Sequence, residues 1–406
     1  MPAGSDAARG AAVSGVTAVS RLIPPDAPWQ LECSACEHRQ PGGIPAGVCP
    51  ACGQPLLVRY ARAPEGAQAL LPRWDMWRYA AFLPLLERER PVSLGEGGTP
   101  LIELPALAQT LGVRRLWVKD EALNPTASFK ARGMSAAITR ARAQAVPGLV
   151  APTAGNAGAA LAAYAAAAGL EARVYAPEST PRAILDTIRA LGARLELVAG
   201  HIGDAGRAAR AFAAESGFLD VSTLREPYRV EGKKTMGLEL AEQLGWRLPD
   251  AVVYPTGGGT GLIGMWKGFD ELRHAGLLSP EAPRPRMIVA QSSGCAPIVR
   301  AFTEGADRAV PWEDPQTHAS GLRVPGPLGD RIMLRVLAES GGDALAVSEE
   351  QIRAGTRRLA LASGVDAAPE GGCALAVAEA LLAAGRLARD AEVVLFNTGS
   401  GASYRS

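Results

Sequence analysis

The chain has 406 residues, and 42 Lys and Arg balance 41 Asp and Glu to a formal net charge of +1. These charges are interspersed, so no basic stripe is present to attract nucleic acid, and charges or prolines interrupt every apolar run before it could span a membrane. The length allows two lobes and a substantial core. We therefore expect a globular protein whose partner is a small molecule, not nucleic acid or a membrane.

The first segment is compositionally simple. Residues 1–27 consist mainly of Ala, Gly, Ser and Val with scattered charge, and they lack the continuous apolar core of a secretory signal. This composition predicts a disordered tail, and the missing signal predicts a cytoplasmic protein.

Residues 28–61 contain two CxxC pairs, separated by twelve residues that include three glycines and two prolines. Four thiolates at such a spacing can surround one tetrahedral Zn²⁺, and a pair of disulfides would be unusual in the cytoplasm. The alternative is two CxxC turns without a metal. Because four thiolates leave no open coordination position, we predict a structural zinc ribbon with these ligands: Cys33, Cys36, Cys49 and Cys52.

A connector with Trp74, Trp77 and Tyr79 at helical spacing follows, and such a stripe is typical of core packing. From residue 91 onwards, short β-branched runs alternate with Ala- and Leu-rich stretches. This βαβ pattern predicts an α/β fold of parallel sheets covered by helices. We expect a large lobe formed by residues 62–124 and 226–406, with a small lobe of residues 125–225 inserted into it.

The segment from Asn124 to Gly133 places Lys130 in a small, mostly apolar run that leads from a loop into a helix. A desolvated amine is favoured to lose its proton, and the neutral amine is the nucleophile that forms a Schiff base. For a single lysine the alternative is a surface residue at a helix start. Three later segments favour the functional interpretation.

Each of these segments follows a strand-like run and is rich in glycine or hydroxyl groups: Thr153–Gly158, Thr256–Gly261 and Asn397–Gly401. The first is a turn that begins a helix, where free backbone N–H groups point at a ligand. The second has four glycines in five residues and lets the backbone approach a phosphate, but it lacks the lysine of a nucleoside triphosphate loop. The third offers hydroxyls at a strand end.

A Schiff-base lysine, an anion-binding loop and neutral hydroxyls together indicate pyridoxal 5′-phosphate. The order of these segments, with Leu94–Leu101, Lys119–Glu121 and Arg229–Thr235, resembles the threonine synthase family of fold-type II pyridoxal-phosphate enzymes over residues 91–404. The resemblance implies a fold like that of the tryptophan synthase β-subunit, mostly in homodimers. Some relatives carry a zinc ribbon at the same end.

The resemblance also implies residue roles. Lys130 would form the Schiff base and move protons, and Thr398 would face the ring nitrogen. A hydroxyl there cannot hold that nitrogen protonated, which favours elimination and replacement over transamination. The other implied cofactor-binding residues are Phe129 beside the ring, Asn156 at the 3′-oxygen, and, at the phosphate, Gly257, Gly258, Gly259 and Thr260.

For a threonine synthase the expected reaction converts O-phosphohomoserine and water to threonine and phosphate, which requires a second anion site. The candidate ligands are Ser128, Thr153, Arg182, Arg189, Lys233 and Lys234, although each basic residue also fits a solvated helix or a helix start. Ala127 replaces the usual Gly before the lysine, Ala131 replaces a common Asp, and Ser400 replaces a common His. These departures leave the cofactor unchanged but put the substrate in question.

Two alternatives therefore remain. One is a threonine or serine dehydratase-like ammonia-lyase, or a related β-replacement enzyme, which needs no second phosphate site. The discriminating feature is whether basic side chains converge on the substrate end of the pocket. The other is a binding protein with an inactive enzyme lobe, which the joint presence of Lys130, Asn156 and Thr398 disfavours. Glu370, within a pair of expected helices, is a weaker candidate for the pocket.

Overall fold

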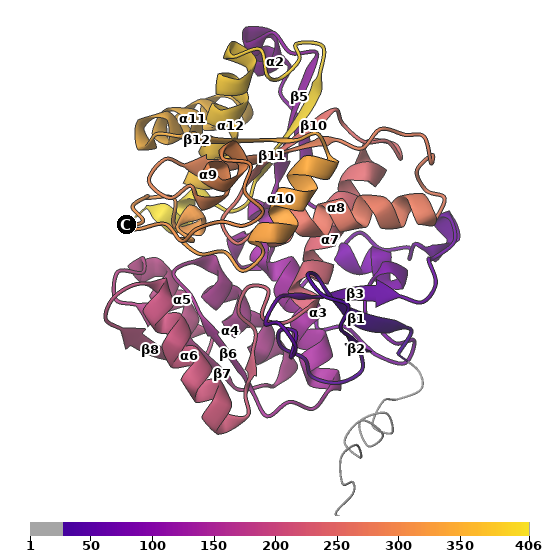
Figure 1. The fold of residues 1–406 in the computed structure, drawn as a ribbon, viewed down its shortest axis with the longest axis vertical. Coiled ribbons are helices and arrows are strands. Elements are labelled where there is room, and N and C mark those ends of the chain that lie inside the picture. Colours follow the sequence, from indigo (N-terminus) through magenta and orange to yellow (C-terminus); the bar gives the residue numbers. More distant parts are fainter. Residues whose placement is uncertain (1–26, 406) are drawn as a thin grey trace, which may run out of the picture.

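The computed structural model describes residues 27–405, so nearly all of the tail expected at 1–27 lies outside the described residues. Three sheets with their helices make up the rest (Figure 1). Within the described range, no helix is both long and apolar enough to cross a membrane.

The N-terminal sheet, which we call the ribbon (residues 28–61), has three short antiparallel strands in the order β2-β1-β3. Leu31 and Val58 form its small core, and this core continues into Ala137 and Tyr228 of the neighbouring helices. The strands are β1 (Trp29–Cys33), β2 (Arg39–Pro41) and β3 (Leu56–Tyr60).

The connector forms two 3-10 helices, η1 (Ala67–Ala69) and η2 (Met76–Phe82). Trp77 and Tyr79 are buried, as the stripe predicts, but Trp74 is 53% exposed. The expected helical spacing does not hold for Trp74 because the helix begins only at Met76.

The large sheet has the strand order β12-β11-β10-β13-β5-β4, and all its pairs are parallel except β4 with β5. Each residue of β10 is buried because helices cover both faces, which explains its continuous apolar sequence. The strands are β4 (Leu101–Glu103), β5 (Arg115–Asp120), β10 (Ala251–Pro255), β11 (Arg286–Ser292), β12 (Asp343–Val347) and β13 (Glu392–Asn397).

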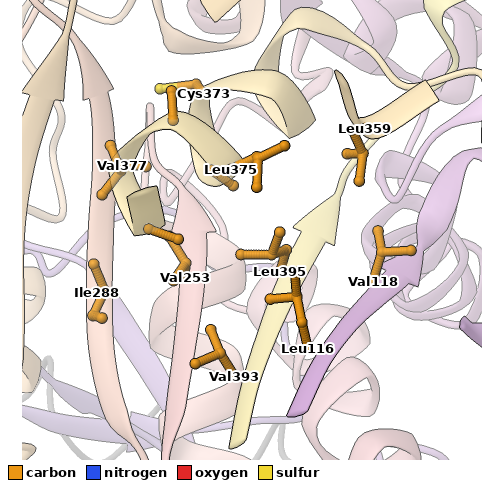
Figure 2. Packing of buried hydrophobic residues seen from close by; sticks show 14 of the residues in the cluster. Leu116, Val118, Val253, Ile288, Leu359, Cys373, Leu375, Val377, Val393 and Leu395 are labelled. Carbon is orange, nitrogen blue, oxygen red and sulfur yellow. The ribbon is translucent and has the colours of Figure 1, made fainter. Parts of the chain in front are cut away.

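Figure 2 shows one face of this sheet, where Leu116, Val253, Ile288 and Leu395 point towards Leu375 of α12. The alternate residues of the same strands face α7, α8 and α10. The large-lobe helices are α2 (Pro105–Leu111), α7 (Tyr228–Gln243), α8 (Thr260–His274), α9 (Pro297–Thr303), α10 (Asp330–Glu339), α11 (Glu349–Ser363) and α12 (Pro369–Ala383).

The third sheet is fully parallel, with the order β8-β7-β6-β9, and it forms the lower lobe in Figure 1. Alanine-rich α4 packs closely on it together with α3 and α5. Its strands are β6 (Leu149–Pro152), β7 (Ala172–Pro177), β8 (Arg194–Val198) and β9 (Leu219–Asp220), and its helices are α3 (Lys130–Ala143), α4 (Asn156–Ala168), α5 (Arg182–Ala190) and α6 (Ile202–Ser216).

Candidate active site

A cavity of about 520 Å³ lies where residues of both lobes meet at the carboxyl ends of β6, β10 and β13. In an α/β protein this is the edge at which ligands bind, because the loops after parallel strands converge there. Lys130 lines it, and so do residues of all three segments that are rich in glycine or hydroxyl groups, among them Asn156, Gly257, Gly258, Gly259, Thr260 and Thr398.

Lys130 is the first residue of α3 and borders the cavity. Protein surrounds its amine on the other sides, and this desolvation, assisted by the charge of Arg229, lowers the pKa of Lys130 to about 7. The Lys130 Nζ lies 4.4 Å from the centroid of the Phe129 ring. A large fraction of this amine is therefore neutral near pH 7, as a nucleophile requires.

The backbone before Lys130 is left-handed, with φ angles of 59° at Thr126 and 52° at Ala127. Glycine adopts such angles without cost, whereas alanine does not. The segment is held in place because Ser400 N donates to Ala127 O at 3.0 Å and Phe129 N donates to Thr398 O at 3.0 Å. The lysine is thus anchored to the end of β13.

The glycine loop between β10 and α8 is packed too tightly for side chains. A Cβ on Gly257 would lie 2.2 Å from the carbonyl oxygen of Gly321, and one on Gly259 would lie 2.2 Å from the sulfur of Met333. Gly259 caps α8, so the free N–H groups of a 15-residue helix and its positive dipole end border the cavity. This arrangement fits the phosphate group of pyridoxal 5′-phosphate.

The polar groups around the cavity also fit that cofactor. Asn156 begins α4, and Thr398 directly follows β13 with little exposed surface. The hydroxyl of Tyr254, another lining residue, is buried and has no hydrogen-bond partner within residues 27–405. Such an unsatisfied group is expected where a ligand supplies the partner.

Four arginines line the same cavity: Arg207, Arg210, Arg225 and Arg323. Arg207 pairs with Asp204, but Arg210, Arg225 and Arg323 form no ion pair with the described part of the chain. Burial and the charge of Arg225 lower the pKa of Arg210. Because three of these like charges have no ion-pair partner in the described chain, a bound anion would stabilise this cluster.

Two of the predicted substrate-binding residues, Arg182 and Lys234, lie away from the cavity. Arg182 has a side chain that is 92% exposed and lies 3.6 Å from Asp186, away from the cavity. Lys234 is buried and pairs with Glu231 at 2.5 Å and Glu271 at 2.6 Å. Neither residue reaches the cavity, because Arg182 faces solvent on α5 and Lys234 faces the ribbon side of α7.

The other predicted residues are closer to the site. Thr153 lines the cavity, but its hydroxyl donates to Gly155 O at 2.6 Å and so holds the turn. The Ser128 hydroxyl is buried without a hydrogen-bond partner in the described chain. Lys233 is buried and donates to Phe129 O, and this burial holds the pKa of Lys233 well below its usual value.

Sequence reasoning missed several lining residues, among them the four arginines and Tyr404, and it gave little weight to Glu370. Arg207 and Arg210 lie one helical turn apart on α6, which is a usable signal, but that spacing also describes a solvated helix face. Tyr404 ends η6 (Gly401–Tyr404), which follows the strand end that borders the cavity, and Figure 1 places the C-terminus at the junction of the two lobes.

A buried ion cluster stands behind the site. Arg132 of α3 contacts Glu121 at 2.6 Å and Glu239 at 3.0 Å, and Lys119 also pairs with Glu239. Although burial opposes ionisation, the charges of Arg132 and Lys119 hold the pKa of Glu239 at about 2. This cluster ties α3, which carries Lys130, to β5 and α7.

The four cysteines of the ribbon converge, with all four sulfur atoms within 4.8 Å of one another. Cys33 and Cys52 have their sulfur atoms 3.4 Å apart, and those of Cys36 and Cys49 are 3.7 Å apart. Four sulfurs at such distances match the donor set of a tetrahedral metal site.

The chain matches the model of the family described as "Pyridoxal-phosphate dependent enzyme" over residues 92–399. Among curated proteins it is similar to the threonine synthase of Methanocaldococcus jannaschii, with 35% identity over 80% of each chain. It is also similar to the threonine synthase of Methanosarcina acetivorans, with 36% identity over 80% of this chain and 79% of that one.

Among solved structures, a T.th. threonine deaminase matches with a TM-score of 0.62 and 28% identity, over 74% of this chain and 92% of that one. Maize serine racemase matches with a TM-score of 0.64 and 21% identity, over 75% of this chain and 88% of that one. The latter shows the shared fold.

Proposed function

The chain belongs to the family of pyridoxal-phosphate dependent enzymes and is a relative of threonine synthases, and on this premise we propose that it is a threonine synthase. It would convert O-phospho-L-homoserine and water to L-threonine and phosphate. The observation that carries the proposal is the group of arginines in the cavity that borders Lys130. A dehydratase substrate brings no phosphate, so it would leave this positive cluster without a counter-ion.

Pyridoxal 5′-phosphate, when bound, would supply an aldehyde carbon that an amine can hold and a ring that withdraws electrons from the reacting carbon. We propose that Lys130 is that amine and that it afterwards accepts the Cα proton and moves a β proton of the substrate. Its lowered pKa of about 7 suits both directions of proton transfer. The N-terminus of α8 would hold the cofactor phosphate, Asn156 the 3′-oxygen and Thr398 the ring nitrogen.

The arginines would act on the second phosphate. Arg210, Arg225 and Arg323 lack counter-ions within the described residues and line the cavity, so they can orient the γ-phosphate and stabilise the charge that it gains as it leaves. The γ carbon would then take up a proton and water would add at the β carbon, which gives threonine and phosphate. We further propose a structural Zn²⁺ on the four cysteines, a homodimer and a cytoplasmic location.

The test is release of inorganic phosphate from O-phosphohomoserine by the cofactor-loaded protein, with threonine measured in the same reaction. Lys130→Ala is the control for the chemistry, and Arg210→Met with Arg225→Met tests the anion site. We expect equal amounts of both products with the native chain, none with Lys130→Ala, and a raised KM with the arginine variants. No phosphate from a protein that binds the cofactor would refute the proposal.

A threonine dehydratase is the second candidate, because the T.th. threonine deaminase shares the fold at 28% identity and the chain ends in a Ser-containing Thr398–Gly401 turn. This activity would release ammonia and a 2-oxo acid from threonine. The arginine variants would leave it unaffected, since this substrate carries no phosphate.

A further inference from the structure

Glu370 lies at the start of α12, and this helix start packs against the end of β13. Ala368 N donates to Gly399 O and to Asn397 Oδ1, both at 3.1 Å. Glu370 and Thr398 both line the cavity, and the bonds of Ala368 hold the start of α12 against the two residues that flank Thr398.

The carboxyl of Glu370 is fixed by one oxygen only. Oε1 accepts hydrogen bonds from Gly321 N at 2.7 Å and from the Tyr404 hydroxyl at 2.5 Å. Oε2 is buried and has no hydrogen-bond partner in residues 27–405, and Glu370 as a whole is only 4% exposed. A buried carboxylate oxygen is costly to leave unpaired, so a ligand that supplies a donor or a cation would stabilise it.

The protein itself offers no cation to this oxygen, because Glu370 forms no ion pair in the described chain. Lys130 borders the same cavity, and the charge of Glu370 raises its pKa, but burial and Arg229 together outweigh this effect. The arginines of the cavity do not pair with Glu370 either. A ligand that brings a donor or a cation would therefore give Oε2 the partner that the described chain does not supply.

We propose that Glu370 lies beside the ring nitrogen of the bound cofactor and, with Thr398, holds a proton on that nitrogen. The inference rests on the proposed cofactor site but not on the proposed substrate. A hydroxyl alone does not favour a charged ring nitrogen, whereas a desolvated carboxylate does. Glu370 thereby strengthens the electron withdrawal that a Thr partner alone would leave weak.

The experiment uses the holoprotein loaded with cofactor that is ¹⁵N-labelled at the ring, without substrate. The ring-nitrogen signal is followed by NMR against pH in the native chain, in Glu370→Gln and in Glu379→Gln. Glu379 also lies on α12, but it pairs with Arg358 and does not line the cavity, so it is the matched control. Because no substrate is present, a change in the ring-nitrogen signal cannot come from titration of the substrate's amino group.

We expect Glu370→Gln to lower the proton affinity of the ring nitrogen by at least about tenfold, a shift of about one pH unit, and Glu379→Gln to leave it unchanged. Tyr404→Phe removes a donor from the carboxylate and should shift the midpoint in the opposite direction, which provides a test if Glu370→Gln does not fold. An unchanged midpoint in Glu370→Gln, or a fall in Tyr404→Phe, would overturn the inference.

The outcomes for the two proposals are separable. If the native chain binds no cofactor at Lys130, both the proposed function and the inference are wrong. If the ring nitrogen depends on Glu370 while O-phosphohomoserine releases no phosphate, the inference stands and only the substrate is wrong.

Discussion

The lowered pKa of the Lys130 amine predicts how fast the apoprotein takes up its cofactor at different pH values. With a pKa of about 7, about three quarters of the amine is neutral at pH 7.5, compared with about one in a thousand for an ordinary lysine. We therefore expect the rate of cofactor uptake, followed by absorbance, to rise with pH and level off above about pH 8.

The variant Arg229→Met tests how much a neighbouring positive charge contributes to the lowered pKa of Lys130. Arg229 is buried, and its charge is the second cause, after burial, that lowers the pKa of Lys130. Its removal should move the midpoint of the uptake profile to higher pH. A midpoint at or above pH 9 in the native chain would refute the argument from burial, and a downward shift in Arg229→Met would refute the argument from charge.

The same pKa shift has a consequence for stability. The folded-state pKa of Lys130 lies below its unfolded value of 10.5, so between these values the unfolded chain binds the extra proton. The contribution of Lys130 to the unfolding free energy of the apoprotein should therefore increase with pH from about 7 to 10, at up to about 1.4 kcal/mol per pH unit. The difference between the native chain and Lys130→Met in urea unfolding isolates it.

The buried ion cluster, the left-handed turn and the sulfur cluster each give a further prediction. Arg132→Met should lower the unfolding free energy by about 3–5 kcal/mol in urea denaturation, because it leaves Glu121 and Glu239 buried with too few partners; a loss below about 1 kcal/mol would contradict this. Ala127→Gly should raise the unfolding free energy by up to about 1 kcal/mol, since φ is 52° there, and a lower value would count against strain. The purified chain should contain one zinc per chain by atomic emission, and Cys49→Ser should reduce that content and lower Tm, whereas zinc retained in full by this variant would argue against the site.

Local patterns were sufficient for much of the fold and for the segments that line the cavity. The glycine loop after β10 and the threonine after β13 each belong to one strand–turn unit, so the sequence alone places them at the carboxyl edge of a parallel sheet. The pairing of CxxC motifs similarly predicts the sulfur cluster. These features depend on short stretches of chain whose geometry is nearly independent of the rest.

The substrate end could not be predicted because it depends on contacts between distant segments. Arg210 and Arg323 come from different lobes and have no common sequence pattern. Lys234 has the residue type of a phosphate ligand, but the rotation of α7 directs it to Tyr60 and away from the cavity. Rotational position on a fully buried helix cannot be read from its sequence, since all its faces are apolar or paired.

The contact between Tyr60 and α7 limits how the gene for this protein can be shortened. Tyr60 donates to Glu231 at 2.6 Å, and that carboxylate also binds Lys234 at 2.5 Å and Lys267 at 2.9 Å. A chain that lacks residues 1–61 would open this cluster to water and expose the surface of α8 beside it. The ribbon is therefore not a detachable module, and we expect gene fragments that begin at the connector to give aggregated product on expression.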